Sequence, residues 1–225
     1  LIGKECFGGL DLAAVGDYTA FVLEFNEGDK TQVLVFCWIP EDKYKNRKDA
    51  ARENANIDHW VSQGFVKITP GNVTDYDIIH RDIVALASVY QIKSIGYDPW
   101  NATQLISNLL SDGLPMDGFT QTLANFSPPT KEFERMLRLG KYEHYNNPVL
   151  RWMLSNVVVY RDGNGNLRPD KRRSAEKIDA VIAAIMAHGE FMSAKSKSGT
   201  QSIYETRGLL GSDDTNETDD GKNNN

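Results

Sequence analysis

The stretch from Gly9 to Phe25, GLDLAAVGDYTAFVLEF, constrains the fold of this chain more than any other. Two apolar runs flank a connection of small residues, which predicts a β-hairpin with Asp11 inside the first strand rather than in the turn. A carboxylate buried in a strand is costly unless a positive group compensates it. A bound cation would do so, but an Arg partner or a turn-capping role for Asp11 would be equally compatible with this stretch alone.

Length and composition bound the class of protein. With 225 residues and 40% hydrophobic residues, the chain can form one sizeable α/β domain or two small ones. Cys6 and Cys37 lie in apolar surroundings without metal-like spacing, so we expect reduced core thiols of an intracellular protein. No segment resembles a membrane span or a signal peptide. A first residue of Leu that leads almost directly into a strand suggests a domain of a longer polypeptide.

The charge is unevenly distributed along the chain. A net charge of −6 argues against a simple electrostatic nucleic-acid binder. Residues 121–177, however, contain eleven Lys or Arg and six Asp or Glu. A basic region inside an acidic protein suits an acidic metal site beside a phosphate-contacting surface. Solvated helix faces would give the same pattern, and for Lys/Arg runs in general they are the commoner explanation.

The first half of the chain predicts an antiparallel meander followed by βα units. After the hairpin we expect a strand over 31–39, a charged loop over 41–48, a helix over 49–62, an extended segment over 65–69 and a helix to Tyr90 capped by Thr74 or Asp75. A strand over 93–97 then places Asp98 at its carboxyl end, and a capping box at Asn101 opens a helix. Such units place ligands at the carboxyl ends of their strands.

The second half ends in the clearest helix. Before it we expect a strand over 117–122, a basic amphipathic helix launched by 127–130, a short helix from Pro148, a strand over 157–160 and a turn over 162–166. Ser174 can cap the last helix, whose apolar positions are Ile178, Val181, Ile182, Ile185 and Met186. Asp179 falls in its first turn, at the edge of the buried face. Residues 1–192 are expected to form the domain, and residues 193–225 a disordered acidic and polar tail.

Three acids therefore stand out by placement: Asp11 in a strand, Asp98 at a βα junction, and Asp179 at the start of a helix. Mg²⁺ prefers such oxygen ligands, and two ions about 4 Å apart can support phosphodiester hydrolysis. Acids favour a helix's first turn through its dipole, so Asp179 could also be a modest surface stabiliser.

Four segments of the sequence give more specific evidence than the placement of the acids. The segments GLDL with DYTA at the hairpin, YDPWNA at 97–102, HYNNPVLRWMLSN at 144–156 and KIDAVIA at 177–183 resemble the nuclease domain of tailed-bacteriophage large terminase subunits. The resemblance covers about residues 5–192 in consistent order. It implies an α/β, ribonuclease H-like fold with a mixed central β-sheet, an N-terminal antiparallel meander and helices on both faces.

The resemblance also implies a function. The expected activity is that of a metal-dependent endonuclease, a hydrolase that cuts concatemeric double-stranded viral DNA during genome packaging in the host cytoplasm. Asp11, Asp98 and Asp179 would be its catalytic metal ligands, for two ions of Mg²⁺ or Mn²⁺. The small terminase subunit and the portal protein would be partners, and no membrane is expected. The family's N-terminal packaging ATPase is not expected here, because the chain has no G-x-x-x-x-G-K-[ST] loop.

Other residues are weaker candidates. Asp17 and His144 could support the metal ligands, although a hairpin-edge acid and a loop histidine among aromatics are more often structural. Lys171, Arg172, Arg173 and Lys177 could contact DNA phosphates or belong to a solvated loop. We expect Trp100 and Trp152 to lie in the core.

Two other classes of function remain open at the level of sequence. One is a strand-transfer or junction-resolving enzyme of the same fold. The other is a non-catalytic domain whose basic face docks on DNA or a capsid protein. A sugar-kinase-like phosphotransferase is disfavoured, because no Gly-Thr phosphate turn follows Asp11.

Overall fold

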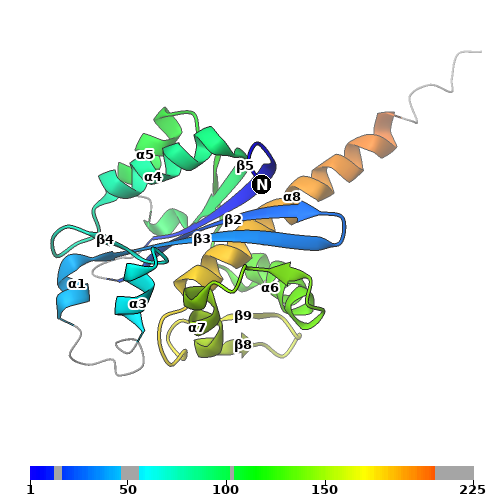
Figure 1. The fold of residues 1–225 in the computed structure, drawn as a ribbon. Coiled ribbons are helices and arrows are strands. Elements are labelled where there is room, and N and C mark those ends of the chain that lie inside the picture. The colour runs from blue at the N-terminus through cyan, green and yellow to red at the C-terminus, as the bar shows by residue number, and fades with distance from the viewer. Residues whose placement is uncertain (13–16, 47–55, 102–103, 206–225) are drawn as a thin grey trace, which may run out of the picture. The chain divides into compact units, whose positions relative to one another are not determined.

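The computed structural model describes residues 1–12, 17–46, 56–101 and 104–205. Within these residues a central seven-stranded sheet has the order β4-β3-β2-β1-β5-β6, with β7 paired to β3 (Figure 1). Its strands are β1 Glu5–Asp11, β2 Thr19–Glu27, β3 Lys30–Pro40, β4 Lys67–Thr69, β5 Gln91–Tyr97, β6 Met116–Gly118 and β7 Tyr142–Glu143. The mixed sheet with its N-terminal meander is as the sequence predicts.

The register of the sheet brings two of the predicted acids to one edge. β1 pairs antiparallel with β2, and β2 pairs antiparallel with β3. β5 instead pairs with β1 in parallel, so that Leu10 lies opposite Tyr97. Asp11 and Asp98 each follow one residue later, and both therefore lie at the carboxyl edge of neighbouring strands.

Helices cover both faces of the sheet (Figure 1). They are α1 Glu41–Lys45, α3 Ile57–Ser62, α4 Tyr76–Val89, α5 Gln104–Ser111, α6 Leu123–Arg138, α7 Pro148–Asn156 and α8 Asp179–Glu205, with a 3₁₀ turn at Pro99–Asn101. α4 and α5 contribute to one hydrophobic core, and α3, α6, α7 and α8 to the other. The side chains of β2 alternate between the two: Phe21 and Leu23 face the first core, Ala20 and Val22 the second.

α8 is the helix that fixes the site, because it packs directly on β1. A Cβ atom on Gly9 would lie 1.9 Å from the backbone oxygen of Ala183 and 2.7 Å from the backbone nitrogen of Ala187. The absence of a side chain at Gly9 therefore permits the close approach. The expected apolar stripe of α8 is buried, but so are the alanines between its members, and the helix is enclosed on all sides from Asp179 to Met186.

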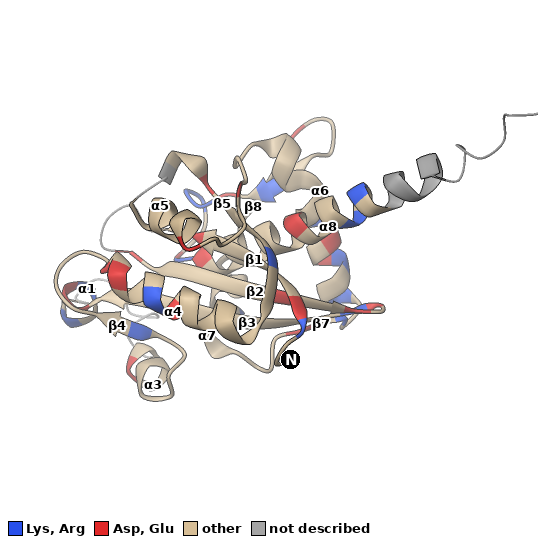
Figure 2. Cartoon of the chain, turned by 90° about the horizontal axis from the view of Figure 1, so that it is seen from above, with Lys and Arg blue, Asp and Glu red and all other residues tan. Residues whose placement is uncertain are grey.

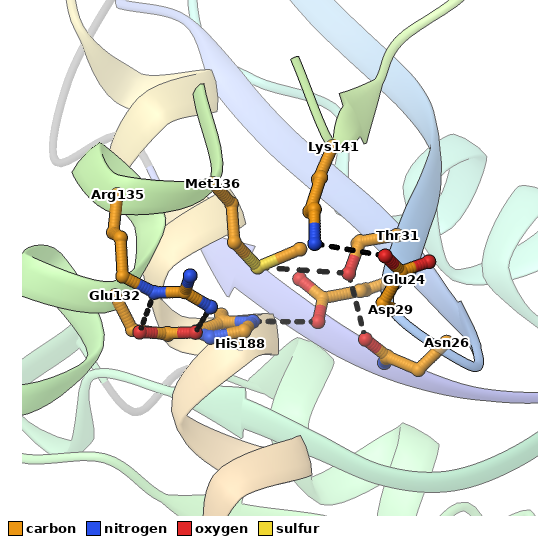
Figure 3. Close-up of polar contacts among 9 residues, drawn as sticks. All are labelled: Glu24, Asn26, Asp29, Thr31, Glu132, Arg135, Met136, Lys141 and His188. Atoms are coloured by element: carbon orange, nitrogen blue, oxygen red, sulfur yellow. Dashed lines mark hydrogen bonds and ion pairs between the residues drawn. The ribbon is translucent and has the colours of Figure 1, made fainter. Parts of the chain in front are cut away.

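Two buried polar contacts hold α8 further along its length. His188 Nδ1 lies 2.8 Å from Glu24 Oε1, and both side chains are buried (Figure 3). Ser94 on β5 donates a hydrogen bond to the Glu190 carboxylate. Since buried polar groups are costly without partners, these contacts favour one placement of α8 on the sheet.

Several predicted boundaries are wrong. The expected loop over 41–48 contains α1, and the expected strand over 117–122 shrinks to β6. α6 begins at Leu123, capped by Thr122, so that both prolines lie inside it rather than before it. They are the sixth and seventh residues of α6, where proline has no N–H to bond the carbonyl four residues earlier. Of the helix expected over 49–62, only α3 lies within the described residues.

The end of the chain also differs from prediction. The strand expected over 157–160 is one arm of a hairpin, in which β8 Val159–Arg161 pairs with β9 Leu167–Pro169. α8 begins at Asp179 rather than after Ser174, whose hydroxyl instead donates to the Asp170 carbonyl. Contacts divide the chain into two compact units, residues 1–192 and 193–225. Residues 193–205 belong to α8, and the remainder of the expected tail lies outside the described residues.

Other expectations about caps and thiols are confirmed. Asp75 caps α4 by accepting hydrogen bonds from the backbone of Asp77 and Ile78. Cys6 and Cys37 are buried free thiols, and burial raises the pKa of Cys6 to about 12. Among the described residues, no helix is both long and apolar enough to cross a membrane.

The prediction that Trp100 lies in the core is wrong, since 89% of the residue is exposed. Trp152 is partly buried and packs against Tyr18 and Trp60. Because the Trp100 ring buries little surface, we expect Trp100→Ala to change the free energy of unfolding by less than about 0.5 kcal/mol in urea denaturation. A loss above about 1 kcal/mol would contradict the exposed placement.

Candidate functional site

Asp11 and Asp179 meet at one end of the contact between β1 and α8. Asp11 is the last residue of β1 and is 1% exposed, while Asp179 is the first residue of α8 and is also buried. Lys171 lies between them: its ammonium donates to Asp11 Oδ2 at 2.6 Å and to Asp179 Oδ1 at 3.1 Å. The positive group that the sequence requires for Asp11 is therefore a lysine in this structure.

The hairpin of β8 and β9 delivers Lys171 to this place. The chain leaves β9 at Pro169 and turns at Asp170, whose carboxylate accepts a hydrogen bond from the backbone of Arg172. The Asp170 carbonyl accepts another from the backbone of Ser174. The turn holds the backbone while the Lys171 side chain, 41% exposed, reaches inward. Lys171 thus lies in a turn that its neighbours Asp170, Arg172 and Ser174 hold by hydrogen bonds.

Burial dominates the electrostatics of the pair. It raises the pKa of Asp11 to about 7, because the Lys171 ammonium opposes this effect only in part and the charge of Asp179 adds to it. Burial also raises the pKa of Asp179, against the attraction of Lys171 and with a contribution from the charge of Asp17. For Lys171, burial disfavours the ammonium, but the two carboxylates outweigh it and raise its pKa.

Two oxygens at this site have no hydrogen-bond donor among the described residues. Asp11 Oδ1 and Asp179 Oδ2 are both buried and unsatisfied. Buried carboxylate oxygens are ordinarily paired, so two of them side by side need an explanation. They are hard oxygen ligands of the kind that Mg²⁺ and Mn²⁺ take, and the pair fits a divalent cation.

Asp98 lies nearby but does not complete a cluster. It follows β5 at the same sheet edge as Asp11, is partly buried, and accepts a hydrogen bond from the backbone nitrogen of Trp100 at 3.1 Å. Within the part of the chain that the structure describes, no three His, Cys, Asp or Glu side chains are arranged to hold one metal ion. The structure therefore brings together Asp11 and Asp179, with Asp98 on the neighbouring strand.

Asp17 and Lys177, two of the weaker candidates from the sequence, pair with each other. The Lys177 ammonium donates to Asp17 Oδ2. The backbone oxygen of Lys177 also accepts a hydrogen bond from Asn156 at the end of α7. Asp17 and Lys177 consequently link the hairpin connection to the segment that leads into α8, and the Lys177 ammonium contacts an acid of this chain.

His144 is not part of this cluster. It follows β7, which pairs with the beginning of β3 through Thr31 and Tyr142. Asp11 is aligned across β2 with the other end of β3, at Cys37. His144 therefore lies at the opposite end of the sheet, and we remove it from the candidate site.

Much of the basic region is locally neutralised. On α6, Arg135 pairs with Glu132 and Arg138 with Glu134, and Lys and Arg are interspersed with Asp and Glu over the chain (Figure 2). Near the site, Arg173 also pairs with an acid, Asp170, at 3.7 Å, whereas Arg172 is exposed. A pocket of about 140 Å³ beside Lys171 is lined in part by Gln121, Arg168 and Arg172. Basic side chains thus border the carboxylates on one side.

The role of Lys171 is what sequence reasoning missed. Its position in a run of three basic residues suggested DNA contact or solvent exposure, and both alternatives overlooked an acid 160 positions away. No local signal in the sequence distinguishes Lys171 from Arg172.

Comparison with known proteins identifies the family. Residues 1–195 match the family model described as terminase large subunit, endonuclease domain. The large terminase subunit of Enterobacteria phage HK97 is 30% identical over 189 residues, which are 83% of this chain and 37% of that protein. Protein YmfN of Escherichia coli K12 is 30% identical over 216 residues, 92% of this chain and 48% of YmfN. The chain therefore spans less than half the length of either relative.

Comparison with solved structures supports the same family. The crystal structure of the HK97 large terminase superposes with a TM-score of 0.76 at 30% identity, covering 83% of this chain and 39% of that one. The large terminase nuclease of thermophilic phage G20c gives a TM-score of 0.54 at 13% identity, over 81% of this chain and 80% of that one, which supports the fold alone. The expected ribonuclease H-like fold is confirmed. The chain belongs to the endonuclease-domain family of bacteriophage terminase large subunits.

Proposed function

We propose that this domain is a divalent-metal-dependent endodeoxyribonuclease whose metal ligands are Asp11, Asp98 and Asp179. The observation that carries the proposal is the pair of buried, unsatisfied oxygens on Asp11 and Asp179 at the end of β1 and the start of α8. Two acids on separate elements, buried side by side, are costly for stability and are explained by a function that needs them.

The residues of the proposed site have different roles. Asp11 lies between the other two, since it contacts Lys171 together with Asp179 and shares a sheet edge with Asp98. It is therefore the residue suited to serve two ions. Bound divalent ions supply an activated water and stabilise the departing oxygen in phosphodiester hydrolysis. Lys177 and Asp17 hold the chain that leads into α8, and Arg172 and Arg173 contact backbone phosphates without reading sequence.

Structural neighbours support metal dependence. The G20c nuclease, which shares the fold, has been crystallised with bound magnesium and with bound cobalt. Both are divalent cations that accept carboxylate ligands. We propose Mg²⁺ or Mn²⁺ as the ion here, with two ions per site.

The wider role follows from the family. We propose that the domain cuts concatemeric double-stranded DNA during genome packaging in the host cytoplasm. In this setting a packaging ATPase domain, the small terminase subunit and the portal protein would be its partners. The chain has no phosphate-binding loop of the ATPase type, so translocation would depend on another domain.

The proposal is tested by nicking and linearisation of supercoiled plasmid. We expect cutting with Mg²⁺ or Mn²⁺, none after EDTA treatment, and recovery when the metal is restored, because the carboxylates have no catalytic capacity for this reaction without a cation. Titration calorimetry measures metal binding in parallel. Cutting that persists unchanged in EDTA, or no binding of either metal, would contradict the proposal.

A further inference from the structure

We propose that Lys171 is a resident counter-cation of the nuclease site, which a divalent ion must displace in order to bind. The inference rests on the function proposed above and concerns how metal occupancy is controlled. Its basis is the contact of one ammonium with both buried acids, at 2.6 Å from Asp11 Oδ2 and 3.1 Å from Asp179 Oδ1.

The ammonium and a divalent ion compete for the same charge. Lys171 neutralises part of the negative potential that would attract a metal to Asp11 and Asp179, and it takes one oxygen of each carboxylate as an acceptor. The second oxygens, Asp11 Oδ1 and Asp179 Oδ2, stay unsatisfied beside it. One ammonium therefore neutralises only part of the negative charge of the two carboxylates. A doubly charged ion would neutralise more of it, which favours replacement of the ammonium.

Lys171 can leave without disturbing the fold. Its side chain is 41% exposed, whereas Asp11 is almost completely enclosed. Its backbone belongs to a turn that Asp170 holds through hydrogen bonds from Arg172 and Ser174. Retraction needs rotation of a flexible side chain and no movement of β1 or α8. The pocket bordered by Arg168 and Arg172 lies on that side, so the released ammonium joins the basic surface proposed to face the DNA phosphates.

The lysine also explains how the metal-free site remains folded. Without a cation, two buried carboxylates would repel each other and remain desolvated, which destabilises a protein strongly. Lys177 is paired with Asp17, so among the described ion pairs Lys171 supplies the compensation for Asp11. The same contact that stabilises the metal-free protein thus opposes metal binding.

The test compares Lys171→Met with the intact chain. In EDTA we expect the melting temperature of the variant to fall, because Asp11 and Asp179 lose their counter-charge. In calorimetry we expect the variant to bind Mg²⁺ about tenfold more tightly than the intact chain, since no ammonium has to be displaced. Mg²⁺ should correspondingly raise the melting temperature of the variant by more.

Lys93→Met is the matched control. Lys93 also pairs with a carboxylate at 2.6 Å, that of Glu5, but both side chains are exposed. We expect this variant to keep the Mg²⁺ affinity and the melting temperature of the intact chain, because exposed ion pairs contribute little. An equal gain in affinity for both lysine variants would show a general charge effect and overturn the inference.

The outcomes separate the two proposals. Equal or weaker Mg²⁺ binding by Lys171→Met, with normal binding by the intact chain, overturns the counter-cation role and leaves the nuclease proposal intact. Absence of Mg²⁺ binding in every variant overturns the nuclease proposal, and the inference with it. If Lys171→Met folds only with Mg²⁺, the inference is supported. Should it fold under neither condition, Lys171→Gln, which retains a hydrogen-bond donor, is subjected to the same calorimetric comparison.

Discussion

Asp11→Asn is expected to lower metal-dependent DNA cleavage by at least about 100-fold, the scale on which removal of one preorganised electrostatic contact acts. Asp11 contacts the same Lys171 ammonium as Asp179, and it lies at the same end of the sheet as Asp98. An amide is a weaker ligand than a carboxylate and carries no charge to hold a cation. The rate of plasmid nicking at saturating Mg²⁺ measures the effect, and calorimetry reports the accompanying loss of affinity.

The fold should survive this substitution. Asn has the shape of Asp, and its side-chain oxygen can still accept a hydrogen bond from Lys171. Circular dichroism therefore separates lost chemistry from lost structure. Asp112→Asn is the control, because Asp112 is exposed and pairs with His80, which is not among the proposed ligands. Full metal-dependent cutting by Asp11→Asn would remove Asp11 from the ligand set.

Gly9→Ala is expected to destabilise the domain by about 3 kcal/mol or more, at the upper end of the range for overpacked sites. The added Cβ would lie 1.9 Å from the Ala183 carbonyl oxygen and 2.7 Å from the Ala187 nitrogen. Both are backbone atoms of a buried helix, so neither can be moved by a change of rotamer. β1 and α8 must therefore separate, which also moves Asp11 away from Asp179. Urea denaturation measures the loss of stability.

A second glycine provides the matched control. Gly163 has nothing within 4 Å of an added Cβ and has no positive φ. We expect Gly163→Ala to change the free energy of unfolding by less than about 1 kcal/mol. If the two variants were equally stable, the direct packing of α8 on β1 at Gly9 would be incorrect.

The order of elements along the chain was largely predictable, and local physics explains why. The apolar run of β2 and the cap at Asp75 are each encoded within a few neighbouring positions. Two predicted boundaries are wrong even though their signals are local. α6 contains two prolines in its second turn, and α8 starts only at Asp179, since the Ser174 hydroxyl donates to the Asp170 carbonyl instead of capping the helix.

The acids proposed as ligands could be picked out from the sequence, whereas their surroundings could not. Asp11, Asp98 and Asp179 are marked by where they fall in their elements, at a strand end, a βα junction and a helix start. His144 lies in a recognisable segment, yet the pairing of β7 with β3 takes it to the other end of the sheet. Trp100, which was expected in the core, lies in the 3₁₀ turn at Pro99–Asn101 and is exposed.

The sequence by itself determined the class of fold and the family, since these are expressed in local periodicity and short motifs, and it supplied the acids that we propose as ligands. Only the tertiary structure decided which cation lies against Asp11. Lys171 is 160 residues away, and it reaches the carboxylate because the hairpin of β8 and β9 folds back to the end of β1. Such a contact depends on the packing of whole elements, and no local pattern around either residue contains it.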